Sequence, residues 1–393
     1  MTEQAKVPAI RFAGFTDPWE QRKLGEIVSI GAGAPPSAFS AGNFLYVKVD
    51  DLNESSHFQF DSAQRVDANT AVKPIRKGSI IFAKRGAAIL GNKVRVLGKT
   101  AYIDTNMMAL EPRGVDADFL WLFINQTGLY RIADTSTIPQ INNKHIEPYP
   151  VDIPNMAEQQ AIGTFFSRLD DLITLHQRKY DKLVIFKKSM LEKMFPKDGE
   201  SVPEIRFAGF TDPWEQRELV DIAEIVGGGT PDTNNSNYWD GDIDWYAPAE
   251  LGNNIYAESS TRKITQAGFD SCSTKMLPAD KTILFTSRAG IGNTAILRHS
   301  ACTNQGFQSL VIGDADVYFV YSMSERIKKW AEEKASGSTF LEISGRQLET
   351  MPVNLPSLVE QQAIGSFFSH LDDLITLHQR KRLSIRQRSP VWS

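Results

Sequence analysis

The chain has 393 residues, of which 41% are hydrophobic and 23% are charged, and its formal net charge is −4 at pH 7. This composition is typical of a globular protein, and the length predicts two or three domains. No apolar run reaches the roughly 18 residues of a membrane-spanning helix, the start does not resemble a signal peptide, and the two cysteines form no CxxC pair. We therefore expect a cytoplasmic protein with no membrane anchor, disulfide framework or cysteine-rich zinc site.

The first element along the chain is a short segment that is repeated later. Residues 10–22 read IRFAGFTDPWEQR, and residues 205–217 have the same sequence. A longer segment, 158–179, returns as 360–381 and differs only where Thr164 becomes Ser366 and Arg168 becomes His370. Two unlike segments, 23–157 and 218–359, separate the copies. This order predicts two equivalent globular units, each followed by the same helix.

Both unlike segments have the patterns of mixed α and β structure. Short β-rich runs follow turn signals at 78–84 and 282–286, whereas 119–124 and 317–330 have helical patterns. The motif from Phe82 to Arg85 aligns with the motif from Phe285 to Arg288. The two segments are therefore expected to share one fold while differing at most surface positions.

Each unlike segment also contains a basic run without Asp or Glu at the same relative position. The runs are 68–103, with Lys73, Arg76, Lys77, Lys84, Arg85, Lys93, Arg95 and Lys99, and 281–313, with Lys281, Arg288 and Arg298. A solvated strand surface would explain one such run. The recurrence favours a polyanion such as DNA, because local Lys and Arg residues determine phosphate affinity.

A long amphipathic helix follows each unit. The first is expected from Glu158 to about Phe195, because Pro196 is a stop signal and the apolar residues between them recur with heptad spacing. We expect it to pair antiparallel with the second helix. That second helix is shorter, since its apolar seam becomes polar after Leu383 and Pro390 ends it.

Two features of this helix pair carry further expectations. If the second helix is short, the first helix from about Leu183 to Met194 is left unpaired, which predicts poor solubility or self-association. His176 and His378 occupy the same seam position, where an apolar residue is expected. The simpler interpretation is a polar residue that sets the register of the pair. A metal or pH-sensing role is the alternative, although no carboxylate–histidine ligand spacing accompanies either histidine.

The sequence contains no complete catalytic motif. Lys93 stands where a Walker A loop ending at Gly98-Lys99-Thr100 needs its first glycine, and Gly227 to Gly229 is no dinucleotide fingerprint. Neither a G-x-S-x-G elbow nor an Asn-Pro-Pro-aromatic motif is present. We therefore expect a chain that catalyses no reaction itself and holds no metal or cofactor.

Polar, glycine-rich loops are the best candidates for a binding function. Asn and Gln can pair with the adenine edge, Arg with guanine, and Lys or Thr with phosphate, although turns are rich in Gly and Asn for conformational reasons alone. The candidate DNA-binding residues of the first unit are Lys84, Arg85, Asn92, Lys93, Asn106, Gln140, Asn143 and Lys144. Those of the second unit are Gly228, Thr230, Asn234, Ser287, Arg288, Asn304, Gln305 and Arg346.

The repeated segments resemble those of a known protein family. PEIRFAGFTDPWEQR (203–217) and EQQAIGxFFSxLDDLITLHQRK resemble the conserved regions of the specificity subunit of type I restriction–modification enzymes. The segments 228–231, 285–288 and 303–306 are similar to motifs of that family's target-recognition domains. The resemblance covers essentially the whole chain. It fails after Lys381, where the tail RLSIRQRSPVWS does not match the first copy.

The resemblance implies an α+β fold with two mixed α/β target-recognition domains in a pseudo-twofold arrangement, separated by an antiparallel pair of long helices. The implied domains are 1–153 and 198–355 for target recognition, 154–197 for the first spacer helix and 356–393 for the shortened second one. The implied function is non-catalytic recognition of a bipartite DNA sequence with a fixed gap, which directs adenine methylation and DNA cleavage by other subunits.

The resemblance also implies partners. They are double-stranded DNA, two modification subunits that use S-adenosylmethionine, and restriction subunits that use ATP and Mg²⁺. Apolar residues of the two helices would bind the modification subunits: Phe165, Phe166, Leu169, Leu172, Ile173, Phe367, Phe368, Leu371 and Leu374.

Two other interpretations stay open. The chain could be a stand-alone DNA-binding regulator with two domains, or a coiled-coil scaffold whose globular ends bind proteins. The acidic net charge favours the scaffold over the regulator, because an autonomous DNA-binding protein usually carries a basic domain. Co-purification with a methyltransferase would favour the specificity subunit over both.

Overall fold

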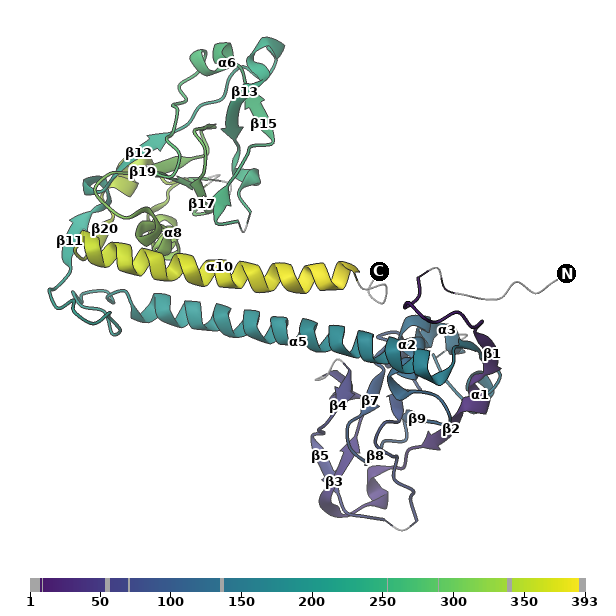
Figure 1. Ribbon diagram of the computed structural model, residues 1–393. Helices are drawn as coiled ribbons and strands as arrows, with labels where there is room; N and C mark the ends of the chain where they lie inside the picture. The colour runs from purple at the N-terminus through teal and green to yellow at the C-terminus, as the bar shows by residue number, and fades with distance from the viewer. Residues whose placement is uncertain are drawn as a thin grey trace. The chain divides into compact units, whose positions relative to one another are not determined.

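The computed structural model describes residues 8, 10–53, 57–69, 71–134, 138–252, 254–288, 290–337 and 341–388 (Figure 1). The chain forms two compact units. Unit 1 comprises Met1–Lys179 and His378–Ser393, and unit 2 comprises Tyr180–Leu377. Two long helices, α5 (Met156–Lys193) and α10 (Leu358–Arg388), contribute residues to both units. Pro390, the expected stop of the second helix, lies outside the described residues.

The described residues of unit 1 form three small sheets and four short helices besides the long ones. A five-stranded sheet has the order β2 (Val28–Ala32), β9 (Met107–Pro112), β6 (Ile80–Ala83), β7 (Arg95–Leu97), β4 (Phe58–Gln59), and only the β4–β7 pair is parallel. A three-stranded sheet has the order β5 (Gln64–Val66), β3 (Ala41–Val47), β8 (Ala101–Ile103), and β1 (Glu20–Lys23) pairs with β10 (Pro150–Ile153). The helices are α1 (Leu24–Ile27), α2 (Ala117–Thr127), α3 (Leu129–Ile132) and α4 (Asn143–Ile146), with 3-10 turns η1 (Pro36–Ala38), η2 (Asp50–Asn53) and η3 (Ala87–Ile89).

Unit 2 repeats this topology strand for strand. Its five-stranded sheet has the order β12 (Ala223–Gly227), β19 (Gln308–Ile312), β16 (Thr282–Phe285), β17 (Thr294–Leu297), β14 (Tyr256–Ala257), and its three-stranded sheet has the order β15 (Arg262–Ile264), β13 (Trp239–Tyr246), β18 (Cys302–Thr303). β11 (Glu215–Glu218) pairs with β20 (Pro352–Leu355). The helices are α6 (Gln266–Asp270), α7 (Val317–Ser322), α8 (Ser324–Lys334) and α9 (Gly345–Glu349), with 3-10 turns η4 (Leu219–Asp221), η5 (Ser236–Tyr238) and η6 (Pro248–Glu250).

The central strand explains how each unit is layered. β6 is buried along its whole length, and its side chains alternate between two hydrophobic clusters. Ile80 and Phe82 pack with Trp121 of α2, whereas Ile81 packs with Leu45 of β3. The five-stranded sheet therefore lies between a helical layer and the three-stranded sheet. Such a strand reads as a continuous apolar run, as the sequence predicted for 78–84.

The expected elements are confirmed at this level. β6 and β16 fall within the predicted β runs, and α2 contains the predicted helix 119–124. The predicted helix 317–330 consists of two helices, α7 and α8, that meet at Met323. The fold class, two similar mixed-sheet domains joined by long helices, is confirmed as well. The four-part division at 153, 197 and 355 stays a prediction.

The repeated segments have structural reasons to be identical. In unit 1 the Arg11 guanidinium binds the buried Glu158 carboxylate with two hydrogen bonds of 2.6 and 2.7 Å. Arg206 and Glu360 make the same pair in unit 2, at 2.6 and 2.7 Å. Both pairs join the short repeat to the first turn of a long helix. The geometry is bidentate, the arrangement in which an Arg–carboxylate pair is strongest.

A second shared contact joins each long helix to the cap of a shorter one. The side chain of Gln159 accepts a hydrogen bond of 2.9 Å from the backbone N–H of Asp116, the residue that caps α2. Gln361 accepts the equivalent bond of 3.1 Å from Asp316, which caps α7. At Gly365, a Cβ would lie 2.1 Å from the Asp316 carboxylate, so no larger residue fits.

One expectation about the long helices is wrong. The distal part of α5 was expected to be unpaired, but Leu183, Met190 and Leu191 pack against the core of unit 2. The ring of Phe195 lies 6.2 Å from that of Phe368, and the Lys187 ammonium lies 2.6 Å from the Asp372 carboxylate. These contacts run antiparallel. In such a pair the distal part of α5 faces the intact first part of α10, so a shortened α10 does not expose it.

Candidate nucleic-acid interface

Four of the predicted DNA-binding residues of unit 1 gather at the carboxyl end of β6. The backbone N–H of Lys84 donates to the carbonyl of Asn106 at 2.8 Å, and the N–H of Ile141 donates to the carbonyl of Lys84, also at 2.8 Å. Arg85 forms an isolated β-bridge with Gln140. Residues from three separate parts of the sequence are therefore held together by backbone hydrogen bonds, which leaves the side chains of Lys84 and Arg85 to other contacts.

The remaining four candidates of unit 1 divide into two pairs. Asn143 and Lys144 are exposed in the first turn of α4, two residues after Ile141. Asn92 instead has a structural role, because its side chain donates to the carbonyl of Asn125 at 2.8 Å and accepts from the N–H of Leu129 at 2.9 Å. Lys93 bonds to the side chain of Asn53.

Unit 2 brings its candidates together at the equivalent end of β16. The N–H of Ser287 donates to the carbonyl of Gly306 at 2.8 Å, and the N–H of Gly229 donates to the carbonyl of Thr303 at 2.9 Å. The hydroxyl of Thr230 bonds to the side chain of Gln305. Gly228 is required by close packing, since a Cβ there would lie 2.1 Å from the carbonyl oxygen of Asn304.

Arg288 and Arg346 are the two basic candidates of unit 2. Arg288 is half-buried and follows Ser287, whose carbonyl accepts from the N–H of Ile343 at 3.1 Å. This bond brings α9, which carries the exposed Arg346, to the same edge as β16. Asn234 is exposed in a separate turn, where its N–H donates to the Asp232 carboxylate at 3.0 Å.

Ser287 lies in a different environment from the one that DNA binding requires. Its side chain is 0% exposed, and its hydroxyl has no hydrogen-bond partner among the described residues. The backbone of Ser287 shapes the edge, but the side chain does not reach its surface. No sequence pattern indicates this burial, because serine is common both in exposed turns and in cores.

The basic residues of the two runs are not equally available. In the described part of the chain, Lys84, Arg85, Lys144, Arg288 and Arg346 make no ion pair. Other basic residues of the runs form ion pairs or are buried. Lys73 and Arg76 lie 3.9 and 4.0 Å from the Glu111 carboxylate, Arg298 lies 3.0 Å from Asp280, and burial lowers the pKa of Arg95 to about 10. Five cations without an acidic partner therefore lie beside the amide side chains at these strand ends, although Lys77, Lys99 and Lys281 elsewhere in the runs also make no ion pair among the described residues.

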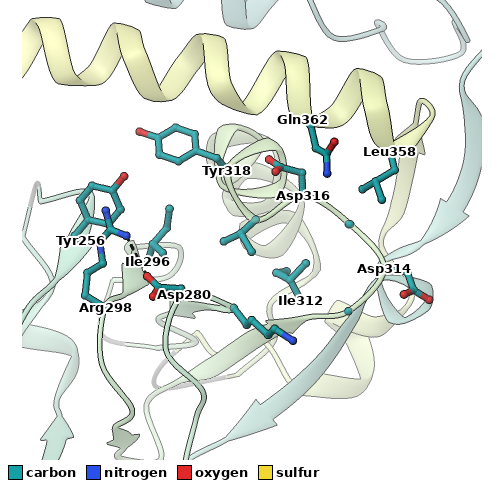
Figure 2. A pocket seen from close by; sticks show the side chains of 14 residues that line it. Tyr256, Asp280, Ile296, Arg298, Ile312, Asp314, Asp316, Tyr318, Leu358 and Gln362 are labelled. Carbon is teal, nitrogen blue, oxygen red and sulfur yellow. Dashed lines mark hydrogen bonds and ion pairs between the residues drawn. The ribbon is translucent and has the colours of Figure 1, made fainter.

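A cavity of about 530 Å³ lies at the opposite end of β16, beside the first part of α10 (Figure 2). Three of its charged side chains are engaged in contacts within the protein. The guanidinium of Arg298 stacks on the ring of Tyr256 at 3.8 Å and pairs with Asp280, while Asp316 caps α7. None of the predicted DNA-binding residues lines this cavity.

The predicted docking residues on the helices differ between the two copies. Phe368 and Leu371 are 0% and 5% exposed in unit 2, where they pack in the core with the distal part of α5. Phe165 and Leu172 of α5 are 43% and 44% exposed, and Leu374 is 45% exposed. Phe166, Leu169, Ile173 and Phe367 are intermediate. The more exposed residues are the ones able to contact a partner.

No cluster of three or more potential metal-ligating side chains occurs in the described ranges. Within the same ranges, no helix is long and apolar enough to cross a bilayer. His176 and His378 do meet, with their Nδ1 atoms 2.8 Å apart, and burial lowers the pKa of both imidazoles.

Comparison with known proteins decides the family. The model of the type I restriction modification DNA specificity domain matches residues 16–184 and again residues 211–387. The chain belongs to this family. The two matches correspond to the two copies of the fold, so the predicted family, a specificity subunit rather than a catalytic one, is confirmed.

Individual members of the family give the extent of the likeness. The MjaIX specificity subunit of Methanocaldococcus jannaschii is 38% identical over 168 residues, which cover 41% of this chain and 38% of that protein. The HindI specificity subunit of Haemophilus influenzae is 22% identical over 82% of this chain and 86% of its own length. Among solved structures, a type I restriction–modification S subunit from M. genitalium superimposes with a TM-score of 0.60 at 16% identity, over 97% of this chain and 96% of that one. The last comparison supports the fold alone.

Proposed function

We propose that this chain is the DNA-recognition subunit of a type I restriction–modification complex, in which unit 1 reads one half of a bipartite target and unit 2 reads the other. One observation carries the proposal. The two units have the same strand order, yet equivalent positions at the edge beside the central strand carry different side chains, such as Gln140 and Glu342 or Asn143 and Gly345. A shared scaffold with unlike binding edges is what two unlike half-sites require.

The chemistry of these edges suits base recognition. Arg85 and Arg288 follow the central strand at equivalent positions. The carbonyl of Asn106 accepts a hydrogen bond from the N–H of Lys84, and the N–H of Asn304 donates to the carbonyl of Tyr246 in β13. Arg can bond guanine with two hydrogen bonds and Asn can do the same with adenine. Each such contact discriminates against a wrong base by about 1–3 kcal/mol.

Reaction chemistry would come from other subunits of the complex. Two modification subunits would methylate adenine with S-adenosylmethionine, and restriction subunits would cleave DNA with ATP and Mg²⁺. The helices α5 and α10 would hold the modification subunits through exposed apolar residues such as Phe165 and Leu374. The gap between the half-sites would then be fixed by the length of these helices.

Paired substitutions test the proposal. The double variant Arg85→Ala/Asn106→Ala should relax one half of the methylated sequence, and Arg288→Ala/Asn304→Ala should relax the other. The measurement is the sequence of methylated sites in cells that express each variant with its modification subunit. If both variants lowered methylation equally at all sites, the residues would be phosphate contacts and their assignment to base reading would be wrong.

A further inference from the structure

The distal part of α5, together with Met194 and Phe195 that directly follow the helix, fills a seat on unit 2. Met194 and Phe195 are 3% and 2% exposed there, and the ring of Phe195 lies 5.9 Å from Trp214, 5.3 Å from Phe319 and 6.2 Å from Phe368. Eight residues earlier, the Lys187 ammonium binds both oxygens of the Asp372 carboxylate at 2.6 and 2.7 Å. The seat thus combines an aromatic pocket with a buried carboxylate.

Unit 1 has the same seat, but nothing in the described part of the chain fills it. The equivalents of the three pocket rings are Trp19, Phe119 and Phe166, and here they line an open cavity of about 420 Å³ together with Phe12 and Phe165. Trp19 and Phe119 are in edge-to-face contact at 6.0 Å, and their counterparts Trp214 and Phe319 are in a tilted contact at 5.7 Å. The pocket is therefore formed, and its walls are mostly apolar.

The carboxylate of this seat is also present and unpaired. Asp170 is the equivalent of Asp372 and is 8% exposed, yet it makes no hydrogen bond or ion pair with any described residue. Its neighbours are His57, from the loop before β4, and Asp171 on its own helix; His57 in turn lies 3.3 Å from Asp118 of α2. An uncompensated buried carboxylate is costly, and a cation placed beside it would remove that cost.

The sequence explains why α10 does not fill the seat of unit 1. By the spacing of the repeats, the position of Lys187 in α10 is Ser389, which carries no charge, and Pro390 follows it. The tail therefore has no cation at this position, and proline, a residue that disfavours the continuation of a helix, stands next to it. The two missing contacts are independent, and the segment 187–195 supplies both in unit 2.

We propose that unit 1 binds, in trans, a helix of a partner polypeptide that carries Lys or Arg and, seven and eight residues further on, two large apolar side chains. Charge complementarity at Asp170 and the empty aromatic pocket define this occupant. The chain's own segment from Lys187 to Phe195 shows, in unit 2, how such an occupant binds. The proposal concerns assembly, so it stands whether or not the two units read DNA as proposed above.

A peptide with the sequence of residues 180–197 is the probe. Labelled with a fluorophore and titrated with the full chain, it should bind saturably in an anisotropy assay. Asp170→Asn in the chain, or Lys187→Glu in the peptide, should weaken binding at least about tenfold, because each leaves a charge of the pair without its partner. Asp171→Asn removes an exposed neighbouring carboxylate and should change the affinity less than about twofold.

A second substitution tests the aromatic pocket. The peptide with Met194→Ala and Phe195→Ala should bind at least about tenfold more weakly than the parent peptide, since both side chains are buried in the seat of unit 2. The melting temperature of each chain variant controls for unfolding.

Several results would overturn the proposal. They include an absence of saturable binding and an affinity that neither Asp170→Asn nor Lys187→Glu changes. If the peptide bound only after deletion of residues 389–393 or 1–7, those residues of the chain itself would be the occupant of the seat. A dimer of the chain that the peptide dissociates would assign the seat to a second copy.

Discussion

Asp170 gives the sharpest prediction about stability. Burial raises the pKa of its carboxyl from 3.8 to about 6, although His57 opposes the shift. Each pKa unit corresponds to about 1.4 kcal/mol, so the ionised carboxylate destabilises the folded chain by up to about 3 kcal/mol at neutral pH. We therefore expect Asp170→Asn to stabilise the chain by about 1–3 kcal/mol at pH 7.5.

The sign of this effect depends on pH. Because the pKa is higher in the folded state than in the unfolded state, the folded state holds the proton more tightly, and the stabilisation that results is complete only below about pH 3.8. It is lost as the pH rises through about 6. The advantage of the Asn variant should therefore be largest above pH 7 and should shrink toward pH 4.

Urea unfolding followed by tryptophan fluorescence at pH 7.5 and pH 4.5 measures both effects. The equivalent carboxylate, Asp372, is the matched control, because it is paired with Lys187 and accepts a hydrogen bond of 2.8 Å from Tyr318. Asp372→Asn should destabilise the chain by about 3 kcal/mol, opposite in sign to Asp170→Asn. If Asp170→Asn also destabilised the chain at pH 7.5, or acted equally at both pH values, Asp170 would not be an unpaired buried charge.

Two further predictions concern the repeated helices. Gly365→Ala should lower the free energy of unfolding by about 1–3 kcal/mol in a thermal melt, because its Cβ would lie 2.1 Å from the Asp316 carboxylate. Gly252 has open space around it, so the control variant Gly252→Ala should change the stability little. Equal effects of the two substitutions would contradict the packing argument. The His176–His378 contact should weaken only as the pH falls below about 6.5, since burial lowers the pKa of both imidazoles from that ordinary value. Protonation would add two positive charges beside the lysine three residues further on in each helix. The double Gln variant should lose this part of the pH dependence in melts between pH 5.5 and 8, and an unchanged profile would show that the pair does not titrate.

The sequence predicted the features that depend on pattern and repetition. The identical segments indicated two equivalent units, and the matching strand orders confirm them. The β-rich run 78–84 and the helix 119–124 lie where their apolar patterns placed them. Such predictions succeed because the spacing of apolar residues indicates which face of a strand or helix is buried, and both copies of the fold bury equivalent faces.

What the sequence could not predict depends on contacts between distant residues. Ser287 was expected to face DNA, but the bonds of its backbone to Gly306 and Ile343 bury it. The distal part of α5 was expected to be unpaired, because the aromatic seat formed by Trp214 and Phe319 cannot be recognised in either segment alone. One part of the Asp170 site is visible in the sequence, because Ser389 stands where the second copy would need an equivalent of Lys187.

The central proposal is that each unit reads its own half of the target. The most direct test replaces residues 23–157 with a second copy of residues 218–359, expresses this chain with its modification subunit, and maps methylated adenines across the genome. We expect a new target in which both halves are the sequence that unit 2 reads in the parent chain. A target that keeps the two unlike halves of the parent target would contradict the proposal.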